Sequence, residues 1–276
     1  MLERLKTQKN LKRFILGQIL WRSQLCRLFI INRGQYRLRF FPTALSMSYW
    51  FDENERKGDE TFIGIYLRQG DCMIDVGANI GALTLVAAQS VGNNGQVVSI
   101  EAHPTIFTYL KKNISLNQVG NVKLINMAVG NEEGEVSFSN KRSDDQNEVT
   151  YNDKHTITVS VDRLDDILVE GAYERIHLLK VDVEGYEKFV FEGGERTLQK
   201  TDCVYFESWE QHFVKHGYSS RDCLNLLREQ GFEVYQQRDG QYKPVATNYT
   251  SQKRENLFAI RDLSQFLTRI EGIDSL

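Results

Sequence analysis

The sequence predicts an α/β fold, with a mostly parallel sheet that helices cover on both faces. Residues 72–76 (CMIDV) have the apolar pattern of a buried strand, and the glycine-bearing turn GANIG leads from them into a helix over 80–90. A strand at 96–100, a helix at 105–117 and a strand at 122–126 follow. This βαβαβ order indicates parallel strands joined by crossover helices.

The alternation of strands and helices breaks after residue 126 and then returns. Gly134–Ser139 and His155–Val161 have strand character, and we expect an antiparallel excursion with a mobile polar loop over 140–153. Gly231 is placed to cap a helix. The remaining predicted elements are helices at 161–168, 186–199 and 219–230, and strands at 176–182, 203–207, 232–236 and 256–261.

A different pattern precedes the first strand. Residues 1–31 read as a helix and residues 35–50 as a strand or hairpin, followed by a helix in TFIGIYLRQG whose end Gly70 can cap. We therefore divide the chain into an N-terminal extension, residues 1–60, and a main domain, residues 61–276. Residues 35–70, from this strand or hairpin to the end of the helix, are expected to roof the ligand site.

Charge is distributed unevenly along the chain. Up to Arg39 the sequence has ten Lys or Arg residues against Glu3 alone, and the remainder, by subtraction from 34 basic and 37 acidic residues, has 24 basic and 36 acidic residues. An RNA-modifying enzyme usually spreads positive charge around its active face, and this body is acidic. A nucleic-acid partner is therefore not expected.

The N-terminal helix is basic and partly apolar. Arg22 and Arg27 interrupt it too early for a membrane span, and no small-residue cleavage site marks a signal peptide. Two alternatives stay open: the helix packs on the body or on a protein partner, or it lies on the inner face of an anionic membrane. The apolar residues that suggest a membrane contact are Phe14, Ile15, Leu16, Trp21, Leu25, Phe29 and Ile30.

The four cysteines show no metal-binding spacing. Cys26, Cys72, Cys203 and Cys223 stand in apolar or helical surroundings, without a C-x-x-C pair. Reduced, buried cysteines are typical of a cytoplasmic protein, which we therefore predict.

The first strand and its turn have the features of a nucleotide-type pocket. Asp75 ends the strand, and Gly77, Asn79 and Gly81 let the backbone approach a ligand. The helix that follows directs free N–H groups and partial positive charge into the turn. The glycine spacing differs from that of a nicotinamide or flavin site, although Glu101 ends the next strand where a ribose-binding acid would stand.

A second informative stretch is LLKVDVEGYEKFVFEGG. Lys180 and Asp182 share one side of a strand, and Glu184 begins the turn after it. Ligands of open α/β sheets bind at the carboxyl ends of the strands, so we expect both acids at the pocket. A lysine in an apolar strand needs a partner, and Asp182 is the nearest acid on the same side.

These motifs resemble class I S-adenosylmethionine-dependent methyltransferases and, more narrowly, the FkbM family. DVGANIG, EAHP, VDRLDD and KVDVEGYE occur in the family's order over residues 71 to about 210, with His103 where the family often has a small polar residue. The resemblance implies a seven-stranded sheet whose last strand is antiparallel. It also implies a cofactor site made of Asp75, Gly77, Ala78, Asn79, Gly81, Glu101, Ala102, Ala128 and Asp182.

The resemblance further implies O-methylation of a hydroxyl on a sugar, a glycan- or lipid-linked saccharide or a small natural product. N-methylation of a small molecule or protein remains an alternative. A third hypothesis is a non-catalytic protein that keeps the cofactor fold for binding and docks through its basic helix.

Several side chains are candidates for the chemistry. Asp182, Glu184, Glu207 and His103 are potential bases at strand ends, and Lys180 belongs to the same predicted site. Asp182 and Glu207 have the hard oxygen ligands that Mg²⁺ prefers, although direct hydrogen bonds to the substrate are the favoured role. Together with Glu184, Trp209 is expected to contact the substrate.

Overall fold

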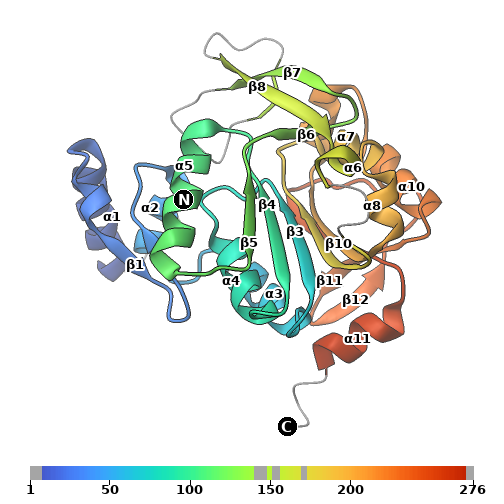
Figure 1. The fold of residues 1–276 in the computed structure, drawn as a ribbon, viewed down its shortest axis with the longest axis horizontal. Helices are drawn as coiled ribbons and strands as arrows, with labels where there is room; N and C mark the ends of the chain where they lie inside the picture. Colours follow the sequence, from blue (N-terminus) through green and yellow to red (C-terminus); the bar gives the residue numbers. More distant parts are fainter. Residues whose placement is uncertain (1–7, 140–147, 151–155, 169–172, 272–276) are drawn as a thin grey trace.

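The computed structural model describes residues 8–139, 148–150, 156–168 and 173–271, and its centre is a twisted sheet (Figure 1). Over these residues the sheet has eight strands in the order β12-β11-β13-β10-β9-β3-β4-β5. The strands are β3 (Cys72–Val76), β4 (Gln96–Ile100), β5 (Val122–Ile125), β9 (Ile176–Val181), β10 (Thr201–Ser208), β11 (Glu233–Arg238), β12 (Gln241–Pro244) and β13 (Glu255–Ile260).

The seven predicted strands of this sheet are confirmed. Neighbours among β5, β4, β3, β9 and β10 pair in parallel, and β13 is antiparallel to both β10 and β11. The sequence analysis missed β12, which forms a hairpin with β11 through Asp239 and Gly240. Both residues have positive φ, as a two-residue hairpin turn of type I′ requires.

Helices cover both faces of the sheet because the strand residues alternate between two cores. Met73 belongs to the core under α3, α4, α5 and α11, whereas Ile74 and Val76 belong to the core under α7, α8 and α10. These helices are α3 (Lys57–Tyr66), α4 (Ala82–Val91), α5 (Pro104–Asn117), α7 (Glu187–Glu192), α8 (Glu195–Gln199), α10 (Ser220–Glu229) and α11 (Leu263–Glu271).

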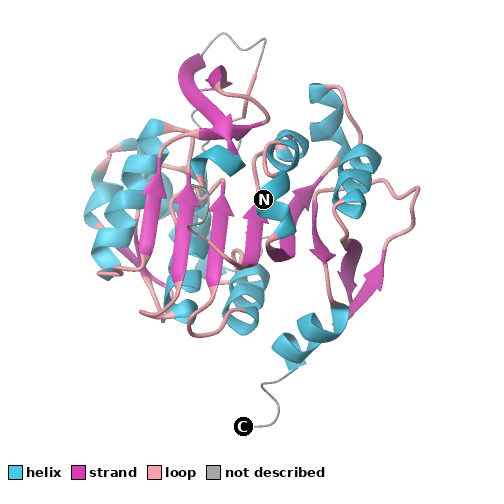
Figure 2. Cartoon of the chain, turned by 45° about the vertical axis from the view of Figure 1, so that its right-hand side comes forward, coloured by secondary structure: helices cyan, strands magenta, loops and turns pink. Residues whose placement is uncertain are grey.

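A second, small sheet lies beyond the carboxyl ends of the parallel strands (Figure 2). It contains β6 (Ala128–Gly130), β8 (Thr156–Arg163) and β7 (Gly134–Ser139) in that order. The predicted antiparallel pair is confirmed as β7 and β8, and β6, which was not predicted, pairs in parallel with β8. His155 and most of the predicted loop lie outside the described residues.

Three predicted helix boundaries were wrong, and some short elements were missed. The 161–168 helix is only α6 (Leu164–Ile167), because β8 continues to Arg163. The 186–199 helix is split at Gly193, where a Cβ would lie 1.9 Å from the carbonyl oxygen of Gly130. Gly70 does not cap α3, which ends at Tyr66. Short helix α9 (Glu210–Phe213) and 3-10 helix η3 (Val214–His216), as well as α11, were missed.

One predicted cap is confirmed. Gly231 follows α10 with a φ of 85°, and Phe232 N donates to Leu227 O over 3.1 Å, which closes the last turn of that helix.

The N-terminal segment is not the continuous helix that the sequence suggested. Helix α1 (Gln8–Arg22) ends where Gln24 takes a left-handed φ of 60°, and η1 (Leu25–Leu28) follows. Strands β1 (Ile30–Asn32) and β2 (Arg37–Arg39) form the expected hairpin. The rest of the predicted strand region is helix α2 (Ala44–Phe51), which the Thr43 side chain caps. Residues 1–7 lie outside the described part.

The described part of α1 packs on α2, at the left edge of Figure 1. Phe14 and Phe51 meet edge to face at 5.4 Å, and Trp50 Nε1 donates to Arg13 O over 3.0 Å. Leu20 belongs to the same core as Met73, and α3 spans the predicted boundary between residues 60 and 61. The N-terminal extension therefore shares one hydrophobic core with the sheet.

Two further expectations concern the cysteines and the membrane. Cys26, Cys203 and Cys223 are buried and Cys72 is half-buried, as predicted, while the cytoplasmic location stays a prediction. Among the described residues, no helix combines the length and the apolar character that a membrane crossing requires.

Candidate active site

A cavity of about 910 Å³, including its opening, lies at the carboxyl ends of β3, β4 and β9. The residues after these strands form its floor, α2 supplies one wall, and residues of the small sheet close it from above. This is where an open α/β sheet binds ligands, next to the point at which the strand order reverses. The lining residues from outside the three strand ends include Leu45, Tyr49, Arg56, Met127, Phe138, Val149 and Tyr186.

The turn after β3 requires glycine at its first position. Gly77 has a φ of 77°, and a Cβ there would lie 1.9 Å from the carbonyl oxygen of Asp182. The Gly77 and Ala78 N–H groups both donate to Ile100 O over 3.0 Å. Asn79 has a φ of 50°, a conformation that asparagine tolerates better than most residues. The turn is thus fixed by main-chain hydrogen bonds to the end of β4.

Glu101, at the end of β4, is held by main-chain donors on both oxygens. Oε2 accepts from Asn79 N over 2.9 Å, and Oε1 accepts from His103 N over 2.8 Å. The carboxylate lines the cavity with 8% of the residue exposed. Because each carboxylate oxygen can accept a second hydrogen bond, Glu101 can also receive the hydroxyls of a ligand.

Two residues predicted to contact the cofactor are not among the described residues that line the cavity. Asp75 is fully buried below the turn, where Oδ2 accepts from Thr84 Oγ1 over 2.7 Å. Gly81 directly precedes α4, and a Cβ at this position would lie 2.4 Å from Leu110 of α5. Glycine therefore allows α4 and α5 to pack closely. Ala78, Ala102 and Ala128 do line the cavity.

Lys180 has a nearer partner than the predicted one. Its Nζ lies 3.1 Å from Asp75 Oδ1 and 3.8 Å from Asp182 Oδ2, and it donates to Gly77 O over 3.1 Å. Asp75 and Lys180 are register partners in neighbouring parallel strands, so their side chains leave the same face. Burial opposes the charge of Lys180, yet the two aspartates raise its pKa above the ordinary value.

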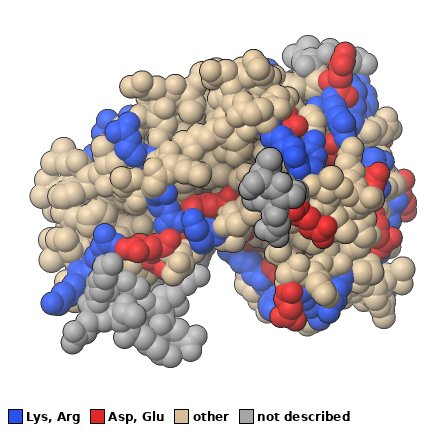
Figure 3. Space-filling model, turned by 90° about the horizontal axis from the view of Figure 1, so that it is seen from below, with Lys and Arg blue, Asp and Glu red and all other residues tan. Residues whose placement is uncertain are grey.

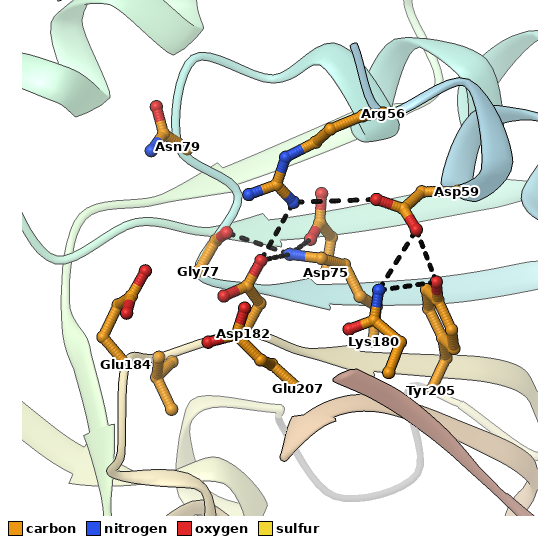
Figure 4. A network of polar contacts seen from close by, with 12 residues as sticks. Arg56, Asp59, Asp75, Gly77, Asn79, Lys180, Asp182, Glu184, Tyr205 and Glu207 are labelled. Atoms are coloured by element: carbon orange, nitrogen blue, oxygen red, sulfur yellow. Dashed lines mark hydrogen bonds and ion pairs between the residues drawn. The ribbon is translucent and has the colours of Figure 1, made fainter. Parts of the chain in front are cut away.

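Asp182 pairs with an arginine that the sequence analysis did not single out. Arg56 Nη1 lies 3.0 Å from Asp182 Oδ2 and 4.0 Å from Asp59 Oδ2, and Figure 4 shows its guanidinium between the two carboxylates. Burial disfavours the Asp182 carboxylate, but Lys180 and Arg56 prevail and lower its pKa to about 2. Asp182 is therefore ionised and already engaged at neutral pH.

Glu184 is held in an unusual backbone conformation at the rim of the cavity. Its φ is 55°, and Glu187 fixes the turn on both sides by accepting from Val183 N and Gly185 N, each over 3.0 Å. A non-glycine residue in this region persists only where its surroundings enforce it. Glu187, the second glutamate of KVDVEGYE, thus holds the backbone of the turn and so orients Glu184, the first glutamate.

Two buried carboxyl groups, Glu184 and Glu207, share one arginine. Arg254 Nη2 lies 2.6 Å from Glu184 Oε2, and Arg254 Nε lies 3.4 Å from Glu207 Oε1. Burial, with nearby acids, raises the pKa of Glu184 to about 9 and that of Glu207 to about 7, and Arg254 opposes both shifts. Glu184 lines the cavity, whereas Glu207 is not among the described lining residues.

His212 completes the group that could hold a metal ion. Ligand atoms of Glu184, Glu207 and His212 lie within 4.8 Å of one another, and burial lowers the pKa of His212 to about 4, so its imidazole is neutral at pH 7. Arg254 already places its charge against both carboxylates. Asp182 lies close enough to Glu207 to raise the pKa of that carboxyl, but its Oδ2 is paired with Arg56, and the predicted Mg²⁺ site of these two acids stays a prediction.

The other two candidates have structural roles. His103 caps α5, where its Nδ1 accepts from Thr105 N over 3.2 Å, and it also lines the cavity. The Trp209 ring lies 4.3 Å from the His212 ring at an interplanar angle of 48°, and Arg254 lies over the Trp209 ring at 5.5 Å. Trp209 is not among the described residues that line the cavity, and its role as a substrate wall stays a prediction.

The glycine turn, the anchored Glu101 and the cavity at the strand ends are the features of a class I methyltransferase. Residues 75–234, more than half of the chain, match the methyltransferase FkbM domain, and the chain belongs to this family. It is therefore an S-adenosylmethionine-dependent methyltransferase, as the sequence predicts. The alternative of a non-catalytic binding protein is not supported.

Three proteins with named activities resemble parts of this chain at low sequence identity or over short lengths. The hexuronic acid methyltransferase AglP of Haloferax volcanii is 24% identical over 197 residues, which cover 70% of this chain and 77% of that protein. The 2-O-methyltransferase NoeI of Sinorhizobium fredii is 39% identical over 71 residues, 26% of this chain and 29% of that protein. Methyltransferase 1 of Beauveria bassiana is 28% identical over 143 residues, 44% of this chain and 57% of that protein.

Proposed function

We propose that this enzyme methylates a hydroxyl group of a saccharide and that Glu184 is its general base. The observation that carries the proposal is the position of Glu184, a carboxyl group with a raised pKa that lines the same cavity as the glycine turn. Below, the cofactor half of the cavity means Gly77–Asn79 and Glu101–His103, and the acceptor half means Arg56, Asp182 and Glu184.

The cofactor half fits S-adenosylmethionine. Glu101 would receive the ribose hydroxyls, since main-chain donors fix its carboxylate and leave acceptor capacity. The side-chain-free Gly77 and the N-terminus of α4 would receive the methionine part. When bound, the cofactor supplies an electrophilic methyl group.

The acceptor half supplies what an alcohol needs, which is the removal of a proton. A hydroxyl oxygen becomes a good nucleophile only as its proton leaves, and Glu184 in its carboxylate form can accept that proton. Arg254 keeps part of the Glu184 population ionised by opposing the effect of burial. An amine acceptor needs no such base, and this favours O-methylation over N-methylation.

Asp182 is suited to a different role in the same half. With a pKa lowered to about 2 by Lys180 and Arg56, it is a weak base, and its remaining acceptor capacity can orient an acceptor hydroxyl. Tyr49 and Tyr186 add ring surfaces with polar tips to the lining, which suits the mixed surface of a sugar. The hexuronic acid and 2-O-methyltransferase relatives agree with a saccharide acceptor.

The test is methyl transfer from labelled S-adenosylmethionine to a panel of neutral sugars, hexuronic acids, lipid-linked saccharides and matched amines. We expect transfer to a hydroxyl acceptor, and a loss of roughly 10²- to 10⁴-fold in kcat for Glu184→Gln. Calorimetric binding of S-adenosylhomocysteine should be unchanged in Glu184→Gln and lost in Glu101→Ala.

Glu195→Gln is the matched control, because Glu195 is an exposed glutamate on α8. It should leave both activity and cofactor binding unchanged. Full activity of Glu184→Gln would remove Glu184 from the mechanism, and transfer to amines alone would replace O-methylation by N-methylation.

A further inference from the structure

Exposed large apolar side chains gather in one short segment of the protein. Among the described residues, only Val214 of this group lies elsewhere. Leu28 is the most exposed, at 77%. We call this group the apolar strip; its members are Leu11, Ile15, Leu16, Ile19, Leu25, Leu28, Phe29 and Ile30.

Within α1, the residues of the apolar strip lie on a different side from those that pack on α2. Leu11, Ile15 and Ile19 follow one another at four-residue steps along the helix and point to solvent. Gly17 lies on the other side, where a Cβ would meet Met47 at 2.7 Å. Leu20, on that side too, is buried. A helix with apolar residues on both sides normally has both sides covered.

The charge of the segment indicates what covers it. From Arg4 to Phe51 the sequence has ten Lys or Arg residues and no Asp or Glu. Lys12 and Arg22 are exposed on the same helix as the apolar strip. Figure 3 shows broad uncharged surface on the upper left, on the side where α1 lies, and acidic and basic side chains next to each other on the lower left and on the right.

We propose that the segment from α1 to β1 is a docking surface for an anionic membrane. The apolar strip would enter the boundary between headgroups and acyl chains, and Lys12 and Arg22 would contact the anionic headgroups. A second copy of the chain fits less well, because a two-fold contact brings each patch against itself and would oppose like charges. The opposite side of α2 lines the cavity through Leu45 and Tyr49, so docking places the cavity one helix away from the membrane.

The experiment is sedimentation of the full chain with vesicles of phosphatidylcholine alone or with phosphatidylglycerol added. We expect binding to the anionic vesicles only, and weaker binding at high salt. A triple variant, Ile15→Gln with Ile19→Gln and Leu28→Gln, and a charge variant, Lys12→Glu with Arg22→Glu, should each lose binding by about tenfold or more.

Val214→Gln is the matched control, since it removes an exposed aliphatic side chain outside the apolar strip. It should bind as the wild type does, and all variants should still bind S-adenosylhomocysteine, which shows that they fold. The proposal is overturned if the wild type does not sediment with anionic vesicles or if the variants bind unchanged. Equal binding to neutral vesicles overturns it too, as does a dimer, in the absence of vesicles, that the triple variant abolishes.

Discussion

The two halves of the cavity are held in different ways. In the cofactor half, main-chain groups hold both the glycine turn and Glu101, and all of them lie between residues 77 and 103. In the acceptor half, buried charges hold one another. There, Arg56 pairs with Asp182, and Arg254 pairs with Glu184. These residues come from three separate parts of the chain. The cofactor half is thus a local structure, while the acceptor half depends on the whole fold and on its charge balance.

The largest effect on cofactor binding and activity should come from the glycine turn, where the main chain leaves no space. Gly77→Ala places a Cβ 1.9 Å from Asp182 O at a φ of 77°, so we expect S-adenosylhomocysteine binding and activity to be lost. The free energy of unfolding should fall by about 1–3 kcal/mol, measured by urea denaturation. Gly58→Ala, at a helical position with open space, should be neutral or slightly stabilising. Cofactor binding by Gly77→Ala would contradict this account.

The second effect tests how much the buried ion pair below the glycine turn contributes to stability. Lys180→Met leaves Asp75, which is fully buried, without its cation, and we expect unfolding to become easier by about 3–5 kcal/mol. Adding Asp75→Asn should restore part of this loss, because the amide is neutral. Urea denaturation of the single and double variants measures the coupling. Strictly additive losses would show that the pair is not the cause.

A smaller effect is expected on the pH dependence of the reaction. Arg254 opposes the raised pKa of both Glu184 and Glu207, so Arg254→Ala should raise these values further. Because the base must be deprotonated, the acid limb of the pH–rate profile should move upward by about one unit. Because the pKa of Glu184 is already raised to about 9, the variant should lose activity throughout the pH range below that value and recover it only at higher pH. Arg221→Ala, an exposed arginine on α10, should leave the profile in place.

The smallest effect concerns metal removal. Arg254 already lies against Glu184 and Glu207, which are two of the three residues grouped as potential metal ligands. We therefore expect EDTA treatment and later addition of Mg²⁺ or Mn²⁺ to leave the rate of methyl transfer unchanged. A rate that falls with EDTA and returns with Mn²⁺ would assign the Glu184, Glu207 and His212 group to a cation instead.

The same contrast explains which features could be predicted from the sequence. The bounds of β3, β4 and β7 were predicted correctly, and so was the position of Glu101 in the cavity. Both depend on patterns of neighbouring residues in the sequence. The contact between Lys180 and Asp75 depends on the register of β9 against β3. This register cannot be read from the sequence. Arg56 and Arg254 stand in polar stretches with no signal of their own. The helix at the N-terminus was predicted too long, because nothing marks Gln24 as left-handed.

One contact near the acceptor half bears on the order in which the enzyme becomes competent during synthesis. Tyr205 Oη donates to Asp59 Oδ1 over 2.5 Å, and Asn256 Nδ2 donates to the same oxygen over 3.1 Å (Figure 4 shows the Tyr205 and Asp59 side chains). Asn256 and the neighbouring Arg254 belong to the region of β13, which leaves the ribosome after all the residues of the cofactor half. A nascent chain could therefore complete the cofactor half well before the half that performs the chemistry.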